Sequence, residues 1–278
     1  MNTKLIMVEG LPGSGKTTTA QLINEIAAKK DIETEIYLEG NLDHPADYDG
    51  VAYFSRDEFT ALLALGDKNT NLLMETAIMS DSSYFVPYKK MGAELPDDLL
   101  SSINKHDIYE LPLELHIELI TAKWEAFAKT AIKSNKTYIF ECCFIQNPVT
   151  MGMVKCGAPK EKVIAYVRSL LEIIKSLNPV LVYVEQNDIE HSFKKAIKER
   201  PKEWSVGFMQ YYNEQGYGKE HNVTGLEGTL EVLKARNELE KHIFEELEME
   251  KVKVNNSQFD NEKYKKELTD TLNKLLVG

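Results

Sequence analysis

A glycine-rich segment near the start of the chain constrains the fold more than any other feature. Residues 10–17 read GLPGSGKT and match the pattern G-x-x-x-x-G-K-[ST]. Residues 5–8 before this segment are all apolar, as in a strand that is buried on both faces, and apolar residues after Lys16 recur at helical spacing. This order of strand, glycine loop and helix predicts a phosphate-binding loop in an α/β protein.

Each residue type in this loop suits the binding of a nucleotide's phosphate chain. Glycines let backbone N–H groups turn toward an anion, and the N-terminus of the helix adds partial positive charge. Lys16 is expected to reach the β- and γ-phosphates, and the hydroxyl of Thr17 is expected to ligate Mg²⁺. The residues expected to bind the nucleotide are Gly10, Leu11, Pro12, Gly13, Ser14, Gly15, Lys16, Thr17 and Thr18. The alternative is a glycine turn that only connects strand to helix, but both flanks favour nucleotide binding.

Strands and helices alternate along the rest of the chain. The predicted strands are 34–38, 137–140, 180–184 and 251–254, and the predicted helices include 159–177, 189–199, 229–248 and 261–276. This alternation predicts an α/β fold with a five-stranded, mostly parallel sheet and helices on both faces, and the phosphate-binding loop at its start makes the P-loop NTPase type the expected one. Ser55 and Glu58 have the spacing of a capping box, which predicts the start of another helix.

We expect residues 1–278 to form a single domain with two additions. Residues 68–135 look mostly helical and lack the alternation of a strand, so a helical insertion is expected there. Residues 200–228 contain five glycines and no clear period, so a flap, or lid, is expected there. Aromatic residues in the flap either stack on a planar ligand or hold the segment against the core.

Charge and cysteine content exclude several classes of partner. The net charge is −11, with 33 Lys and Arg against 44 Asp and Glu, and we see no basic stripe, so a nucleic acid polymer is not expected as a partner. No apolar segment is long enough for a membrane span, and we expect a cytoplasmic protein. Three cysteines without CxxC spacing argue against a disulfide framework or a structural zinc site, and we expect buried free thiols.

Four of the five predicted strands end in glutamate, at positions 9, 39, 141 and 185. Ligands of an open parallel sheet bind outside the carboxyl ends of its strands. Glu141 is therefore expected to share the Mg²⁺ shell with Thr17, and Glu39 is the candidate general base because a polar loop follows it. For each glutamate taken alone, a solvated strand end is the alternative interpretation.

Arginine is scarce in this chain. The 33 basic residues comprise 29 lysines and four arginines, at positions 56, 168, 200 and 236. Arg200 begins the expected flap and could stabilise a transferring phosphoryl group when the flap closes, although it also suits a helix C-terminus. Arg236 lies inside a predicted helix, which favours a structural role. The expected catalytic residues are Lys16, Glu39, Glu141 and Arg200.

These segments together resemble the P-loop nucleoside and nucleotide kinase superfamily, in particular its deoxynucleoside kinase and thymidylate kinase branch. The matching parts are residues 6–18 (IMVEGLPGSGKTT), the strands that end at Glu39 and Glu141, and residues 179–204. The resemblance implies ATP- and Mg²⁺-dependent transfer of the γ-phosphoryl group to a hydroxyl or phosphate of a small-molecule acceptor. It also implies that Glu39 is the base and that Glu141 corresponds to the Glu of a Glu-Arg-Ser motif, although two cysteines follow it here.

Other functions are compatible with the same sequence. The acceptor could be a sugar, an antibiotic or another metabolite, and a regulator could bind ATP and transfer nothing. A GTPase-type switch is suggested by D-x-x-G at 47–50 and N-K-x-D at 104–107, but neither follows a predicted buried strand. The helix at 229–248 suits either a homodimer contact or packing within the chain.

Overall fold

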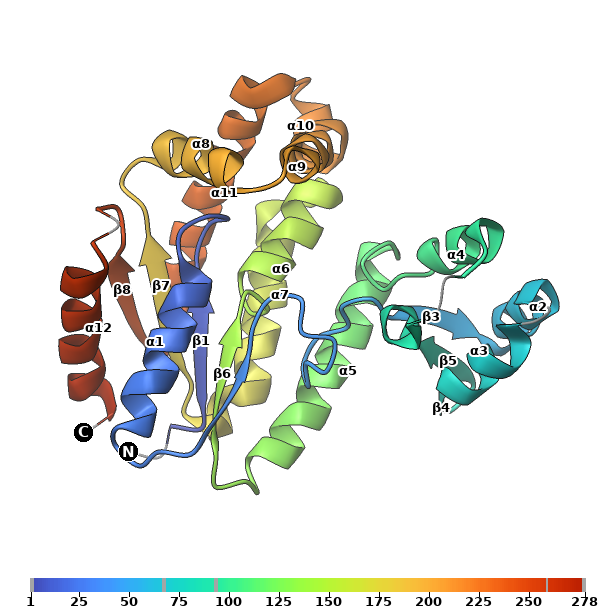
Figure 1. Ribbon diagram of the computed structural model, residues 1–278, viewed down its shortest axis with the longest axis horizontal. Coiled ribbons are helices and arrows are strands. Elements are labelled where there is room, and N and C mark those ends of the chain that lie inside the picture. Colours follow the sequence, from blue (N-terminus) through green and yellow to red (C-terminus); the bar gives the residue numbers. More distant parts are fainter. Residues whose placement is uncertain (1–2, 67–68, 93–94, 259, 277–278) are drawn as a thin grey trace. The chain divides into compact units, whose positions relative to one another are not determined.

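The structure is a computed structural model that describes residues 3–66, 69–92, 95–258 and 260–276 (Figure 1). Contacts within the chain group it into two compact units, 1–39 with 124–278, and 40–123. That the whole chain forms a single domain stays a prediction. The helices and strands that carry the argument below are β1 (Leu5–Glu9), α1 (Lys16–Ala28), β2 (Thr34–Tyr37), β3 (Ala52–Ser55), α2 (Arg56–Gly66), α3 (Thr70–Thr76), β4 (Ile78–Ser80), β5 (Ser83–Val86), α4 (Asp97–Asn104), α5 (Leu113–Ala131), β6 (Thr137–Glu141), α6 (Gln146–Val149), α7 (Lys160–Ile174), β7 (Val180–Glu185), α8 (Ile189–Glu199), α9 (Lys202–Glu214), α10 (Gly216–Glu220), α11 (Gly225–Glu246), β8 (Glu250–Asn255) and α12 (Asn261–Leu276).

The first unit is built on a five-stranded sheet in the order β2-β6-β1-β7-β8. Every neighbouring pair in this sheet is parallel, and β1 lies at its centre between β6 and β7. All five residues of β1 and of β6 are buried, which explains why both strands are apolar almost throughout. The predicted α/β fold with a five-stranded sheet is therefore confirmed.

Helices cover both faces of this sheet (Figure 1). On one face, alternate strand residues such as Ile6 and Val182 pack against apolar residues of α1 and α12. On the other face, the ring of Phe140 lies 5.9 Å from that of Trp124 in α5, and Tyr183 lies 5.8 Å from Phe244 in α11. No helix among the described residues is both long and apolar enough to cross a membrane.

The segment that was expected to be helical, 68–135, also contains two strands. Strands β4 and β5 form an antiparallel sheet with β3, in the order β3-β5-β4. The expectation that no strand lies in this segment is wrong, because strands of three and four residues are too short to show an alternating pattern. The capping box is confirmed, since Ser55 N donates to Glu58 Oε2 at 2.8 Å and Glu58 N donates to Ser55 Oγ at 3.3 Å.

The segment that was expected to be an irregular flap, 200–228, is helical. It contains α9, α10 and the first residues of α11, so the expectation of an irregular segment is wrong. Packing outweighs the weak helix propensity of its glycines: the ring of Phe208 stacks on that of Tyr212, with centroids 4.1 Å apart, and Tyr212 is buried. The aromatic residues thus hold the segment against its neighbours. Its action as a lid stays a prediction.

Candidate functional site

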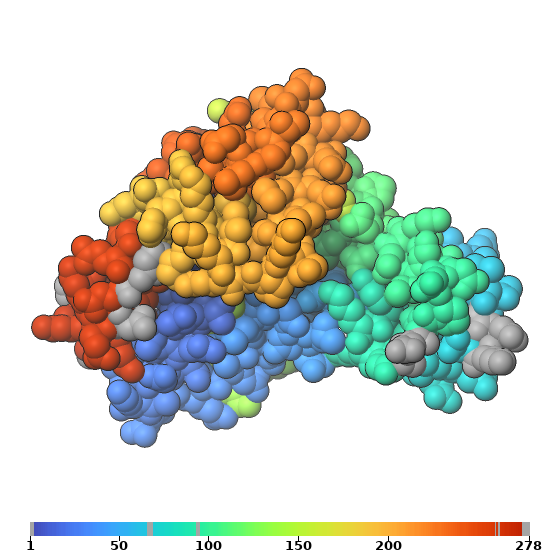
Figure 2. All heavy atoms as spheres, turned by 45° about the horizontal axis from the view of Figure 1, so that its top comes forward, coloured from blue at the N-terminus to red at the C-terminus, as the bar shows by residue number. Residues whose placement is uncertain are grey.

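The glycine loop connects β1 to α1 and is shaped by its glycines. Gly13 and Gly15 have φ angles of +83° and +95°, in the left-handed region that other residues rarely adopt. A Cβ atom on Gly15 would lie 2.3 Å from Nδ2 of Asn256, and one on Gly13 would lie 3.2 Å from Cβ of Ala196 in α8. Figure 2 shows the segment from α8 to α11, in gold to orange, directly beside the N-terminal residues in blue. The loop therefore has the left-handed backbone that is typical of an anion nest, and its neighbours leave little room for side chains at Gly13 and Gly15.

Lys16 is the first residue of α1 and only 5% exposed. Its Nζ donates to the carbonyl oxygen of Leu11 at 3.0 Å, so the side chain folds back over its own loop. Burial by itself lowers the pKa of Lys16, but the nearby carboxylates of Glu39 and Glu141 favour the charged form, and the net shift is upward. A cation is thus held inside the loop and next to carboxylates.

Thr17 and Glu141 meet beside the loop. The Thr17 hydroxyl donates to Oε1 of Glu141 at 2.6 Å, and the backbone N–H of Glu39 donates to Oε2 of the same carboxylate at 3.1 Å. This contact joins the helix after β1 to the carboxyl end of β6. The structure therefore brings Thr17, Glu39 and Glu141 together at one edge of the sheet.

The donor set fits Mg²⁺ through its oxygen atoms. Ligand atoms of Glu39, Glu141 and Cys142 lie within 4.8 Å of one another, and the Thr17 hydroxyl contacts Glu141. Burial raises the pKa of the Cys142 thiol well above its ordinary value, so the sulfur stays protonated and is a poor ligand for a hard cation. Thr17 and Glu141 are the residues that would hold the ion, and Glu39 lies beside them.

The Glu39 side chain is exposed, yet both of its carboxylate oxygens have a donor. Nε2 of Gln146 donates to Oε1 at 3.0 Å, and the Cys142 thiol donates to Oε2 with 3.6 Å between sulfur and oxygen. Cys142 has a φ of +71°, a conformation that only a firmly held turn maintains in a residue other than glycine. The carboxylate expected to act as a base is thus fixed in orientation.

The other two strand-end glutamates do not join this cluster. Glu9 is fully buried and accepts the backbone N–H groups of Phe144 and Gln146, both at 2.8 Å. Burial raises the pKa of Glu9 to about 7, against the effect of these hydrogen bonds. Glu185 lies 3.6 Å from Nζ of Lys253, on the neighbouring strand β8. Glu9 therefore holds the turn after β6, and the side chain of Glu185 is part of an ion pair with Lys253.

Gln146 was missed by the sequence interpretation. It lies in α6, at the end of a turn that follows β6, and it is 7% exposed. Its backbone N–H donates to Glu9 and its side chain to Glu39, so one residue connects two of the strand-end acids. The signal that could have identified it is a pair of amides, Gln146 and Asn147, inside the otherwise apolar run from Cys142 to Val149.

Arg236 is buried beneath the site, in agreement with the structural role expected for it. Its guanidinium donates to Glu240 at 2.7 Å, to the Thr150 hydroxyl at 2.9 Å and to the carbonyl oxygen of Gln146 at 3.2 Å. Arg200 has a different environment, at the C-terminal end of α8 with its guanidinium carbon 4.3 Å from the centre of the Trp204 ring. A catalytic role for Arg200 stays a prediction.

The cysteines have two kinds of environment. Cys142 and Cys143 are buried free thiols, as expected, but Cys156 is an exposed free thiol. The expectation that all three cysteine thiols are buried is therefore wrong. Cys156 comes after the π-helical segment Thr150–Lys155, which the sequence pattern did not predict.

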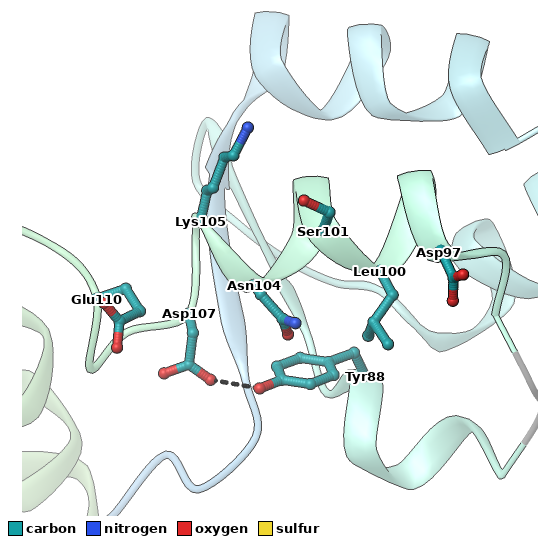
Figure 3. A pocket seen from close by; sticks show the side chains of 8 residues that line it. All are labelled: Tyr88, Asp97, Leu100, Ser101, Asn104, Lys105, Asp107 and Glu110. Atoms are coloured by element: carbon teal, nitrogen blue, oxygen red, sulfur yellow. Dashed lines mark hydrogen bonds between the residues drawn. The ribbon is translucent and has the colours of Figure 1, made fainter. Parts of the chain in front are cut away.

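The N-K-x-D segment lies in the second unit and lines a pocket of about 890 Å³. In Figure 3, Asp107 points toward Tyr88, whose hydroxyl donates to it at 2.7 Å, whereas Lys105 points away from both. Asn104 is the last residue of α4, and residues 47–50 lie outside helices and strands. Neither motif follows a strand of the parallel sheet, so the context typical of a GTPase is missing from the described part of the chain.

Comparison with known proteins gives one result at the level of structure. No model of a protein family matches the chain, and no curated protein matches it. Among solved structures, the chain is similar to thymidylate kinase from Candida albicans, with 12% sequence identity, 99% of this chain and 91% of that chain covered, and a TM-score of 0.42.

Proposed function

We propose that this chain is an ATP-dependent kinase that transfers the γ-phosphoryl group to a hydroxyl or phosphate of a small-molecule acceptor, in the manner of nucleoside and nucleotide kinases. The observation that carries the proposal is the 2.6 Å hydrogen bond between Thr17 and Glu141. It brings the hydroxyl of the glycine loop to the acid at the end of the neighbouring strand, which is the pairing that a Mg²⁺-nucleotide site needs.

Each residue of the site has a separate task. Lys16 and the loop amides bind the phosphate chain, and Thr17 with Glu141 would hold the metal ion. When bound, magnesium-ATP supplies the phosphoryl group and the cation that neutralises its charge. Glu39 takes the proton from the acceptor hydroxyl, and its two hydrogen bonds aim the carboxylate before the acceptor arrives.

The test is acceptor-dependent ADP release from magnesium-ATP, screened over nucleosides, nucleotides, sugars and aminoglycosides. Lys16→Ala should abolish turnover, because the loop loses its cation. Glu39→Gln should lower turnover by about 100-fold while ATP binding is unchanged, as expected when a general base is removed.

Glu185→Gln is the matched control, because Glu185 also ends a strand but pairs with Lys253. Its turnover should stay within about two-fold of the wild type, since its side chain is in a partly exposed ion pair with Lys253 and takes no part in the proposed chemistry. A Lys16→Ala variant with a near-normal rate would contradict the loop assignment. Tight ATP binding without acceptor-stimulated ADP release would favour a regulator that transfers nothing, and use of GTP alone would favour the GTPase class.

A further inference from the structure

We infer that Gln146 is the positioning residue for Glu39, and that its second amide atom recognises a hydrogen-bond donor on the acceptor beside the hydroxyl that is phosphorylated. The inference rests on the proposed function and extends it to a residue outside the loop and the strand ends.

The contact with Glu39 fixes which end of the Gln146 amide is the nitrogen. An ionised carboxylate only accepts hydrogen bonds, so the group 3.0 Å from Glu39 Oε1 must be the NH₂ of the amide. The other polar atom of the amide is Oε1, which is bonded to the same carbon as this NH₂ group. It is buried and has no hydrogen-bond partner among the described residues. A buried amide oxygen without a donor is rare, and here it lies next to the proposed base.

The main chain of Gln146 is held by two hydrogen bonds. Its backbone N–H donates to Glu9 at 2.8 Å, and its carbonyl oxygen accepts from Arg236 at 3.2 Å. Both partners are fully buried, and Arg236 is itself paired with Glu240. The main chain of Gln146 is thus fixed from two sides, which leaves the amide little freedom to turn away from Glu39.

The polar atoms around Gln146 favour one chemical class of acceptor substrate. Glu39 and Gln146 Oε1 both present hydrogen-bond acceptors, so they complement a ligand that offers donors. A phosphate ester dianion offers only acceptors and negative charge. A polyol or an amino alcohol offers a reacting hydroxyl to Glu39 and a neighbouring O–H or N–H to Gln146.

In the reaction, the hydroxyl proton of the acceptor moves to the Glu39 carboxylate, and the oxygen forms a bond to the γ-phosphorus. The bond from this phosphorus to the β–γ bridging oxygen breaks, and ADP leaves with the electron pair. Glu39 then returns its proton to water. Gln146 makes no bond to the reacting atoms and acts through the orientation of Glu39.

The test is a double-mutant cycle with Gln146→Met, which keeps the size of the side chain and removes both polar atoms. It should lower kcat for acceptor-dependent ADP release by about ten-fold and leave KM for ATP unchanged. In a Glu39→Gln background the same change should alter kcat by less than about two-fold, because the positioned base is already gone. Gln146→Leu, which also lacks both polar atoms, should lower kcat as Gln146→Met does, and provides a second variant of similar size.

The matched control is Gln210→Met, because Gln210 is an exposed glutamine in α9. Its kcat should equal that of the wild type. The same double-mutant cycle can be measured on basal ATP hydrolysis. Water is then the acceptor, so the natural acceptor need not be known. Additive losses in the Gln146 and Glu39 variants would overturn the positioning role.

Specificity is tested with matched acceptors: an alcohol with a neighbouring hydroxyl or amine, its analogue without that donor, and its phosphate ester. The wild type should prefer the first over the second by about ten-fold or more in kcat/KM, and Gln146→Met should reduce this preference to about two-fold. Preferred use of phosphate esters, or an unchanged preference in Gln146→Met, would overturn recognition by Gln146. Both results would leave the kinase proposal unaffected. The kinase proposal itself would be refuted if the Lys16→Ala variant turned over at the wild-type rate.

Discussion

Arg236 and Glu240 form an ion pair at 2.7 Å that is almost completely shielded from water, with side chains 1% and 0% exposed. Tyr183 in β7 donates to the other oxygen of the same carboxylate at 2.7 Å, so the pair connects α11 to the sheet. Burial, together with the nearby Glu240, raises the pKa of Tyr183 well above its ordinary value. The carboxylate is thus satisfied by one guanidinium and one hydroxyl.

Arg236→Met should lower the free energy of unfolding by about 3–5 kcal/mol, because the change leaves the Glu240 carboxylate buried without its cation. Urea denaturation monitored by circular dichroism measures the difference. Arg168→Met is the control, since Arg168 pairs with Glu246 at 2.8 Å but is 57% exposed, and its loss should be below about 1 kcal/mol. Equal losses of unfolding free energy in the two variants would contradict the argument that burial makes the loss of Arg236 costly.

Glu9 predicts a pH dependence of stability. Its pKa is about 7 in the folded chain against an ordinary value of 4.5, so folding takes up a proton between these two values. This contribution to stability is fully present below pH 4.5 and is lost as the pH rises through 7, by an amount on the order of 3 kcal/mol. Urea denaturation at pH 5 and pH 8 should show the loss in the wild type and in Glu185→Gln, and a smaller loss in Glu9→Gln.

Gly15→Ala should weaken nucleotide binding by about ten-fold or more, because a methyl group needs a strained φ of +95° and meets Asn256 at 2.3 Å. Isothermal titration with magnesium-ATP measures the effect. Gly207→Ala, in α9, has no neighbour within 4 Å and should leave ATP binding unchanged while stabilising the helix by about 0.5–1 kcal/mol. Normal ATP affinity in Gly15→Ala would show that the loop tolerates another backbone conformation.

Ser55→Ala should lower the free energy of unfolding by about 1 kcal/mol, because the first turn of α2 loses the hydroxyl that accepts from the backbone N–H of Glu58. Thermal unfolding of the two proteins at one pH gives the difference. Thr60→Ala, four residues into the same helix, removes a hydroxyl that donates to the carbonyl of Arg56 and should change stability by less than about 0.5 kcal/mol. A larger loss in Thr60→Ala than in Ser55→Ala would contradict the capping assignment.

Local patterns were sufficient for the parts of the site that depend on a few consecutive residues. The loop around Lys16 is defined by a motif and its two flanks, and Glu39 and Glu141 were placed by the rule that parallel strands end at one edge. Both predictions need only the direction of each strand. The convergence of Glu39, Glu141 and Thr17 follows from this direction and from the order of the strands.

Contacts between distant residues could not be predicted in the same way. Gln146 and Arg236 are 90 residues apart, and no local pattern indicates that the guanidinium of one bonds the carbonyl of the other. The helices α9 and α10 were missed because packing around Tyr212 outweighs their glycines, and Glu9 was not distinguished from Glu39 because burial depends on the whole fold. The sequence therefore predicts which residues end the strands, and tertiary contacts decide which of them lie together at the edge of the sheet.

The central position of β1 also bears on how the protein is made in a cell. Its hydrogen-bonding partners β6 and β7 begin at Thr137 and Val180, so both edges of β1 stay open until far more of the polypeptide has left the ribosome. At about 5–20 residues per second, translation from β1 to β7 takes on the order of ten seconds or more. During this interval the apolar strand LIMVE is available to chaperones or to aggregation, and slower synthesis lengthens that exposure.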